Sequence, residues 1–170
     1  KLVEIDGKTG VLAGARAVVD LGAAPGGWCQ VVRRRVPGAA VVAADLLELQ
    51  PLDGVTFVRG DFTEPSVRHR IREALPEGAA DLVLSDMAPN LSGIRAADQA
   101  RSELLVETAL AFAREVSRPG AALVVKVFQG RGFEAALAEA REAWARVRIV
   151  KPPASRDRSR ETYLVARGLL

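Results

Sequence analysis

Short apolar runs alternate along this chain with longer stretches in which apolar residues recur at helical spacing. The apolar runs have the length of buried strands and lie at 17–21, 40–44, 55–58, 81–84 and 122–127. The stretches with helical spacing lie between them at 28–36, 65–75, 97–116 and 132–144, and Pro-Gly turns stop several of them. This alternation predicts an α/β fold with a doubly wound, mostly parallel sheet, whose ligand crevice opens at the carboxyl ends of the strands.

The last part of the chain departs from this alternation. Apolar runs at 147–150 and 162–166 are separated by a polar segment that is too short to hold a crossover helix. Parallel neighbours need such a crossover, whereas antiparallel neighbours do not. The two runs are therefore predicted to form an antiparallel pair.

The first apolar run ends in a glycine-rich turn at 22–28, whose glycines are Gly22, Gly26 and Gly27. Glycine tolerates positive φ and exposes bare N–H groups, so a strand, such a turn and a helix N-terminus form a cradle for a nucleoside-bearing ligand. The spacing is not that of the G-x-G-x-x-G dinucleotide motif, and no Gly-Lys-Ser/Thr follows for a phosphate. By itself the turn indicates a nucleotide-like ligand and disfavours NAD and ATP.

Length and composition limit the possible classes of protein. A chain of 170 residues, 49% of them hydrophobic, is expected to fold as a single domain spanning 1–170. No apolar stretch approaches the roughly 20 residues that a membrane helix needs, and no signal-peptide pattern opens the chain, so we expect a cytoplasmic protein. The single cysteine, Cys29, excludes an internal disulfide, and we interpret it as a small buried residue. No pattern of metal ligands is visible.

Basic residues gather near the end of the chain. Residues 141–167 contain eight basic and three acidic residues, a net charge of +5, whereas the other residues carry 16 basic and 18 acidic side chains, a net charge of −2. Such asymmetry is typical of a protein that binds a polyanion such as RNA. An ordinary solvated arginine surface would have the same composition.

Four stretches resemble the FtsJ family of RNA 2′-O-methyltransferases: 22–28 (GAAPGGW), 85–90 (SDMAPN), 125–130 (VKVFQG) and 159–163 (SRETY). The resemblance runs from Lys1 to about Gly168 and implies a Rossmann-like methyltransferase sheet of seven strands with one strand reversed. It also implies S-adenosylmethionine as the cofactor and transfer of its methyl group to a ribose 2′-hydroxyl. The resemblance is strongest to members that act on large-subunit ribosomal RNA, and it points to a uridine of 23S rRNA. We expect a monomer.

Other readings stay open on the sequence alone. A related enzyme would methylate tRNA or an mRNA cap, and a non-catalytic RNA-binding factor for ribosome assembly would retain the same pocket. A nucleotide-dependent oxidoreductase is disfavoured because G-x-G-x-x-G is absent. The sequence begins at Lys1, and family members usually carry a basic N-terminal helix before this point. Residues 1–5 match the tail of that element, so we expect the helix itself to be missing.

The cofactor site is predicted at the ends of the first strands. Asp45, about twenty residues after the glycine turn, is where nucleotide-binding α/β units place an acid for ribose hydroxyls. The resemblance implies that Asp61 lies beside the adenine amino group, that Trp28 lines the methionine arm and that Asp86 holds the charged end. A turn or helix cap is the alternative for Asp45 and Asp61, and a core position is the alternative for Trp28.

Lys126 interrupts the apolar run 121–128 near the end of a strand, and a buried lysine is rare unless it is paired. The resemblance carries a Lys-Asp-Lys-Glu catalytic set over to Lys1, Asp86, Lys126 and Glu161. We expect Lys126 to orient the hydroxyl and, when transiently neutral, to deprotonate it. An ammonium that stabilises negative charge on the oxygen is the alternative, since Asp86 and Glu161 favour the charged form. Lys126 could also serve only to close the end of the sheet through an aspartate.

The segment 151–160 is basic and stiffened by prolines. It resembles the family's Lys-Pro-x-x-Ser-Arg-x-x-Ser-x-Glu stretch, and arginine can bind phosphate in a forked geometry. We predict that its basic residues follow the RNA backbone beside the target ribose, namely Lys151, Arg156, Arg158 and Arg160. Because aromatic residues are sparse, we expect an intact ribosomal particle to be a better substrate than a short RNA.

Overall fold

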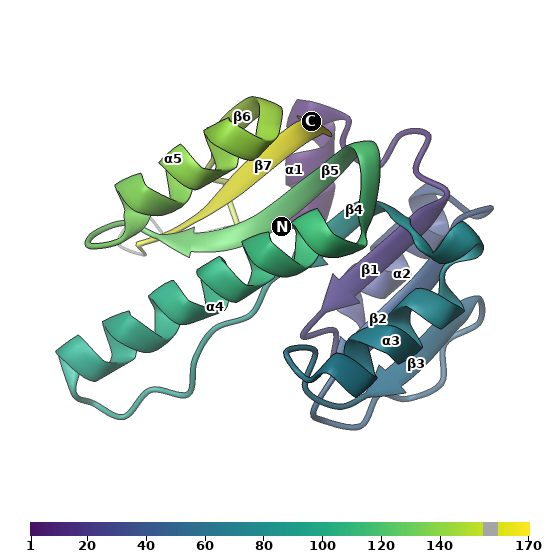
Figure 1. Ribbon diagram of the computed structural model, residues 1–170, viewed down its shortest axis with the longest axis horizontal. Helices are drawn as coiled ribbons and strands as arrows, with labels where there is room; N and C mark the ends of the chain where they lie inside the picture. Colours follow the sequence, from purple (N-terminus) through teal and green to yellow (C-terminus); the bar gives the residue numbers. More distant parts are fainter. Residues whose placement is uncertain (155–159) are drawn as a thin grey trace.

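The computed structural model describes residues 1–154 and 160–170, which build a twisted sheet with helices on both faces (Figure 1). The sheet has seven strands in the order β3-β2-β1-β4-β5-β7-β6. Their bounds are β1 (Ala17–Leu21), β2 (Ala40–Asp45), β3 (Val55–Arg59), β4 (Ala80–Ser85), β5 (Ser117–Phe128), β6 (Trp144–Val150) and β7 (Glu161–Leu169). Strands β1 to β5 pair in parallel, and β7 runs antiparallel to both β5 and β6. The predicted α/β fold with one reversed strand is confirmed.

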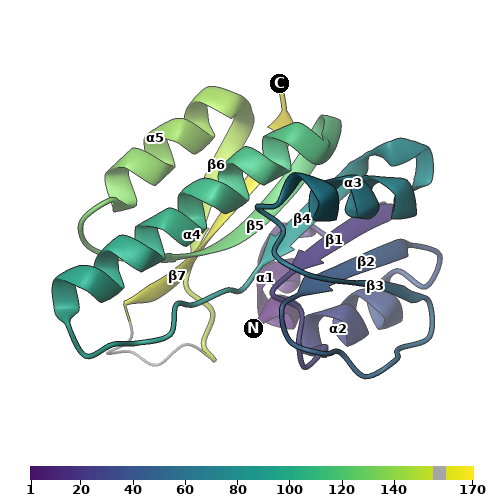
Figure 2. The same ribbon diagram turned by 60° about the horizontal axis from the view of Figure 1, so that its bottom comes forward.

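The helices form two layers, one on each side of the sheet (Figure 2). One layer consists of α1 (Leu2–Thr9) and α2 (Gly27–Arg35), and the other consists of α3 (Pro65–Ala74), α4 (Arg95–Val116) and α5 (Phe133–Ala143). A single 3₁₀ turn, η1 (Pro76–Gly78), precedes β4. Helices on both faces explain why every residue of β1 is buried, as in other parallel sheets.

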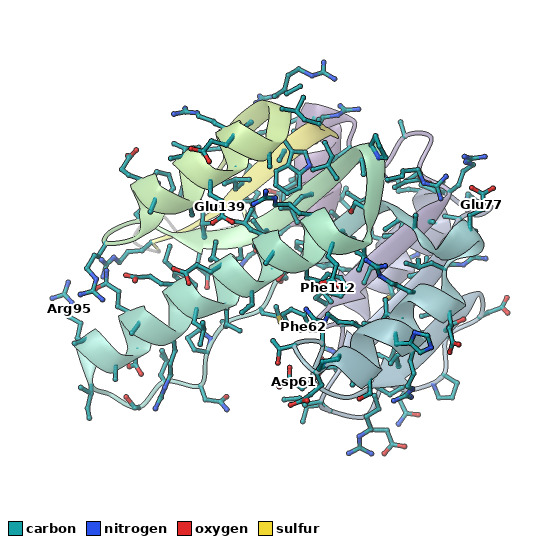
Figure 3. The ribbon with its side chains drawn as sticks, viewed as in Figure 1. Asp61, Phe62, Glu77, Arg95, Phe112 and Glu139 are labelled. Atoms are coloured by element: carbon teal, nitrogen blue, oxygen red, sulfur yellow. The ribbon has the colours of Figure 1, made fainter. Side chains whose placement is uncertain are left out.

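Two apolar clusters fill the space between the sheet and its helix layers. Val19 and Leu21 belong to the cluster under α3, α4 and α5, and Val18 belongs to the cluster under α1 and α2. Phe62 follows β3 and meets Phe112 of α4 edge to face, with ring centroids 5.4 Å apart (Figure 3). Both clusters extend past the carboxyl termini of the strands, so polar residues there lie on a packed base.

Strand β5 begins five residues earlier than the sequence predicts. Its first residue, Ser117, pairs with Ala80, and the register then shifts so that Leu82 pairs with Ala122. The predicted stop at 119–120 lies inside this bulge, where Gly120 takes a φ of 87°. A bulge accommodates residues that regular pairing would exclude.

Helix α1 is a second difference, because the sequence predicts only the tail of a missing helix in this region. Leu2 and Ile5 are buried against the sheet, and the helix ends at Gly10 with a left-handed φ of 66°. Arginines of β6 and β7 donate to the last carbonyls of the helix, Arg148 to Lys8 and Arg167 to Thr9. The helix is thus held beside β7 with its first residue at the carboxyl end of the sheet.

Within the described part of the chain, no helix combines the length and the apolar character needed to cross a bilayer.

Candidate active site

The predicted catalytic residues come together at the carboxyl ends of β4 and β5. The Lys126 side chain is only 7% exposed, and its Nζ lies 3.2 Å from Asp86 Oδ1 and 3.7 Å from Glu161 Oε1. Asp86 directly follows β4, and Glu161 is the first residue of β7, opposite Phe128 of β5. The sheet register therefore holds one buried ammonium between two carboxylates.

Lys1 joins this group from the start of α1. Its Nζ donates to Glu161 Oε2 at 3.1 Å, so Glu161 bridges the two lysines with its two oxygens. Burial alone would raise the pKa of Glu161, but the ammonium groups of Lys1 and Lys126 outweigh it and the pKa lies below its ordinary value. Glu161 is thus an anion at neutral pH. The four residues Lys1, Asp86, Lys126 and Glu161 form one continuous charged chain.

Tyr163 extends the chain, although the sequence assigns it no role. It pairs with Lys126 across β5 and β7, is fully buried, and donates its hydroxyl to Asp86 Oδ1 at 2.6 Å. Burial, followed by the bond to Asp86, raises its pKa far above the usual range, so the phenol stays protonated. Its ring lies 5.8 Å from that of Trp28, which is half-buried in the first turn of α2. Trp28 therefore borders the charged group from the side of the glycine turn.

The three glycines of the turn differ in their backbone conformation and in the space around them. Gly22 and Gly26 have φ values of 67° and 111°, and a Cβ on Gly22 would lie 2.4 Å from Met87 Cγ. Gly27 has neither constraint, because it starts α2 and no protein atom lies within 4 Å of where its Cβ would be. Backbone conformation and protein contacts thus explain Gly22 and Gly26, whereas Gly27 is exposed and has open space around it.

Asp45 and Asp61 both accept backbone hydrogen bonds. Asp45 Oδ2 accepts from Ala24 N–H at 2.8 Å, and Oδ1 accepts from Leu47 N–H at 2.9 Å, so Asp45 ties the glycine turn to the end of β2. Asp61 Oδ1 accepts from the backbone N–H and hydroxyl of Thr63 in a turn after β3 (Figure 3). Both oxygens of Asp45 and the Oδ2 atom of Asp61 can each accept a further bond. The predicted contacts of Asp45 and Asp61 with a cofactor stay predictions.

Asp20 is a second residue that the sequence does not single out. It lies in β1 just before the glycine turn, is 2% exposed, and accepts a hydrogen bond from Cys29 Sγ at 3.1 Å. Burial raises the pKa of Asp20 from 3.8 to about 7, and the negative charges of Asp86 and Asp45 act in the same direction. Among the described residues Asp20 has no ion-pair partner. The sequence does contain a signal, since Asp20 interrupts an apolar strand as Lys126 does.

These features fit a cationic cofactor that carries a nucleoside. The carboxyl groups of Asp20, Asp45 and Asp86 lie around the turn, and Gly27 has open space at a helix N-terminus. A sulfonium and an ammonium would neutralise such a site, whereas the phosphates of a dinucleotide would be repelled by it. S-Adenosylmethionine therefore suits this cradle, and NAD does not.

Cys29 is fully buried, as expected. Burial is the main cause that raises the pKa of its thiol, and the nearby Asp20 acts in the same direction. A buried thiol of this kind is unreactive. No cluster of three or more His, Cys, Asp or Glu side chains that could hold a metal occurs among residues 1–154 and 160–170.

A separate cavity opens beside Glu161, which is one of its lining residues. It has a volume of about 580 Å³ and lies between α4 and α5, and no residue of the glycine turn lines it. Val127 and Phe128 form its wall at the end of β5. The charged group thus borders this cavity through Glu161.

Of the predicted RNA-binding residues, Lys151 and Arg160 lie on the surface at the two ends of the connection between β6 and β7. Arg156 and Arg158 lie outside the described residues. The connection is attached to α1, because Ala154 N–H donates to Glu4 Oε2 at 3.0 Å. The Arg160 carbonyl accepts from Gln129 N–H at 2.8 Å, which places Arg160 beside the loop after β5.

Comparisons with known sequences agree with this arrangement. The family model described as FtsJ-like methyltransferase matches residues 1–169. The chain is 52% identical over 169 residues to "Ribosomal RNA large subunit methyltransferase E" of Pseudomonas paraeruginosa, which covers 99% of this chain and 82% of that protein. The protein of the same name from Azoarcus sp. is 52% identical over 166 residues, covering 97% of this chain and 81% of that protein.

Solved structures share the fold. A Plasmodium falciparum protein described as a ribosomal RNA methyltransferase superposes with a TM-score of 0.88 at 25% identity, covering 99% of this chain and 94% of that one. Human methyltransferase-like protein 13, solved in complex with SAH, gives a TM-score of 0.65 at 13% identity over 92% of this chain and 73% of that one, which indicates a common fold. With the family model matching almost the whole length and half of the residues identical to named relatives, this chain belongs to the FtsJ-like methyltransferase family.

Proposed function

We propose that this protein transfers the methyl group of S-adenosylmethionine to a ribose 2′-hydroxyl of large-subunit ribosomal RNA. The observation that carries the proposal is the buried ammonium of Lys126, held between Asp86 and Glu161 beside an acid-lined glycine turn. The names of the relatives support the substrate, since two of them are ribosomal RNA large subunit methyltransferases. Action as a monomer, in the cytoplasm and on a uridine stays a prediction.

The residues around the glycine turn would hold the cofactor. Gly27 would leave room for it at the start of α2, Trp28 would flank its methionine arm, and Asp20 and Asp86 would lie near its positive charge. When bound, S-adenosylmethionine supplies a methyl group activated by positive sulfur. The chain itself then has to position the acceptor oxygen and control its proton.

Lys126 is the group best placed to hold the acceptor oxygen. Its Nζ forms ion pairs with Asp86 and Glu161, which hold the buried side chain at the end of the sheet. An ammonium in this position donates a hydrogen bond to the hydroxyl and stabilises negative charge as it develops. Tyr163 fixes Asp86, and Lys1 fixes Glu161, so both carboxylates are themselves oriented.

A general-base role requires Lys126 to lose a proton first, while two carboxylates lie within 4 Å of it. The dependence of rate on pH separates the two roles. If Lys126 is the base, the single-turnover rate rises with pH through one ionisation. If it acts as an ammonium, the rate stays flat from pH 6 to 10.

RNA is proposed to enter over the connection between β6 and β7. Lys151 and Arg160 supply positive charge at its ends, and Arg156 and Arg158 add to it in the sequence. Arginine and lysine neutralise phosphates and release counterions, so binding should weaken steeply with salt. The target ribose would then lie beside Glu161, next to the end of this connection.

The decisive experiment measures transfer of tritium from labelled S-adenosylmethionine to ribosomal RNA in 50S subunits prepared without this modification. We expect transfer by the native protein and a loss of about 10²-fold or more for Lys126→Ala. Lys8→Ala, which removes the same side chain from an exposed position of α1, serves as the matched control. Calorimetric binding of the cofactor by each variant shows whether its pocket is intact.

Three outcomes separate the possible functions. Label in a ribose 2′-O-methyl group supports the proposal, and label in tRNA or a cap moves the substrate within the same reaction class. RNA binding without transfer by the native protein would indicate an assembly factor and contradict the proposal.

A further inference from the structure

None of the residues proposed to hold the cofactor lines the cavity between α4 and α5. Its volume of about 580 Å³ lies within the range of small-ligand sites, and it is bounded by α4, α5 and the segment that joins β4 to α4. Figure 3 places Arg95 at the outer end of α4 and Glu139 on α5, and Glu139 reaches Arg114 of α4 at 3.8 Å. The two helices therefore form opposite walls.

The cavity begins one side chain away from the active site. Glu161 lines it, and the Glu161 Oε1 atom is 3.7 Å from Lys126 Nζ. Val127 and Phe128, the two residues after Lys126, also line it. A molecule that touches Lys126 can thus extend past the ends of β5 and β7 into this space.

The lining divides into an apolar floor, acidic walls and a basic rim. The floor is formed by buried aliphatic side chains, including Val106, Val127 and Ala136. Glu103 and Glu139 stand on the walls, half-buried. The arginines are exposed and surround the opening: Arg95, Arg131 and Arg160.

We infer that this cavity receives the base of the nucleotide whose 2′-hydroxyl is methylated, an inference that rests on the proposed function. A base is joined to the carbon next to the 2′-carbon, so a ribose held at Lys126 places its base within reach of the cavity. The flat faces of a base suit the apolar floor, and its N–H edges suit Glu103 and Glu139. Glu103 and Glu139 are paired with Arg131 and Arg114, and the exposed arginines of the rim attract the phosphates on either side.

A base can enter only after it has left its stack in the RNA, as in other enzymes that act on an extruded nucleotide. This explains why the space is larger than the acceptor oxygen alone would need. It also gives the enzyme contact with the base although the reaction occurs on the sugar.

Helix α5 offers a matched pair of positions for a test. Ala135 and Ala138 are both exposed, but only Ala135 lines the cavity. Ala135→Trp therefore fills the space from a position where the larger side chain displaces no core residue. Ala138→Trp adds the same side chain three residues further on, outside the cavity.

The assay is single-turnover methylation of 50S subunits with saturating S-adenosylmethionine. We expect Ala135→Trp to lower kcat/KM for RNA about tenfold or more, because the base can no longer be seated and the ribose is misaligned. We expect Ala138→Trp to change it by less than about twofold, as for other surface substitutions. Cofactor affinity and melting temperature should match the native protein in both variants. Equal rates for Ala135→Trp and the native protein would overturn the inference.

A second measurement does not depend on methyl transfer. Ala135→Cys and Ala138→Cys, each labelled with a benzophenone maleimide, are cross-linked to 50S subunits, and the fully buried Cys29 is protected from the reagent. We expect cross-links from position 135, and not from 138, at the methylated nucleotide or its neighbour. Cross-links at unrelated sites, or equal cross-links from both positions, contradict the inference. If the native protein transfers no methyl group, the proposed function fails, while a base-specific cross-link from 135 alone would still support a base-binding cavity.

Discussion

Replacing Asp20 by asparagine should make the protein more stable and a poorer binder of its cofactor. Asp20 is 2% exposed and receives a hydrogen bond only from the Cys29 thiol among the described residues, so its negative charge is costly in the absence of a cation. Asparagine has nearly the same shape, keeps an oxygen for the thiol and removes the charge. The variant therefore isolates the cost of that charge.

The magnitude follows from the pKa of Asp20, which burial raises from 3.8 to about 7. One pKa unit corresponds to about 1.4 kcal/mol, so keeping Asp20 ionised in the folded protein costs up to about 4 kcal/mol. The folded chain binds the proton more tightly than the unfolded chain does. The stability that this proton contributes is therefore present below pH 4 and is lost as the pH rises to about 7.

Urea unfolding at pH 5 and pH 8 measures this effect directly. Asp20→Asn should raise the free energy of unfolding by about 2–4 kcal/mol more at pH 8 than at pH 5, because Asp20 is protonated at the lower pH. Asp53→Asn removes the same charge from an exposed position and should show no such difference. Affinity of the native protein for S-adenosylmethionine should rise about tenfold from pH 6 to pH 8 as Asp20 ionises, and this rise should disappear in Asp20→Asn.

The same change in stability at both pH values would refute the reasoning, because it would show that Asp20 is not titrating in this range. Cofactor affinity that stays independent of pH in the native protein would refute the second half. It would mean that the charge of Asp20 does not face the bound cation.

Three further predictions concern other parts of the site. Gly27→Ala should leave stability unchanged or raise it by up to about 1 kcal/mol, since alanine favours helices. It should nevertheless weaken cofactor binding measured by calorimetry, because the added Cβ enters the proposed cofactor site. Gly7→Ala, at an equally open position in α1, should not weaken binding. Glu4→Ala should raise KM for RNA with little change in kcat. The variant loses the hydrogen bond from Ala154 N–H to Glu4 that anchors the basic connection, at a cost of about 1 kcal/mol. An unchanged KM would contradict this prediction. Phe112→Ala should lower the free energy of unfolding, measured in urea, by about 3–5 kcal/mol, since Phe112 is only 2% exposed. A loss below about 1 kcal/mol would show that the core closes around the gap.

Most of the sheet could be predicted because buried parallel strands are continuous apolar runs bounded by Gly and Pro. The start of β5 could not, since Pro119 and Gly120 are ordinary strand breakers, and only the shifted pairing of Ser117 with Ala80 reveals the bulge. Helix α1 is short and buries only two residues, and arginines about 140 residues or more away fix its position. Such distant contacts leave no local pattern.

The active site, like the fold, could be predicted from the sequence only in part. Lys126 could be found because a charge in an apolar strand is unusual, whereas its neighbour Tyr163 is set by the register of β5 and β7. The pKa of Asp20 is raised mainly by burial and further by Asp86 and Asp45, and other elements of the packed fold supply all three effects. Likewise, the bond from Tyr163 to Asp86 joins residues 77 positions apart. Residue types indicate where chemistry can occur, but these pairings follow only from the packed sheet.

The position of β7 has a consequence for how the active protein forms. This strand is synthesised last of the seven yet inserts between β5 and β6, and it brings both Glu161 and Tyr163 to Lys126. Until it is inserted, β6 lacks its only partner strand and the lysine lacks one of its two counterions. A nascent chain in which five strands have already assembled would therefore still be inert, and activity would begin only when the closing segment has joined the sheet.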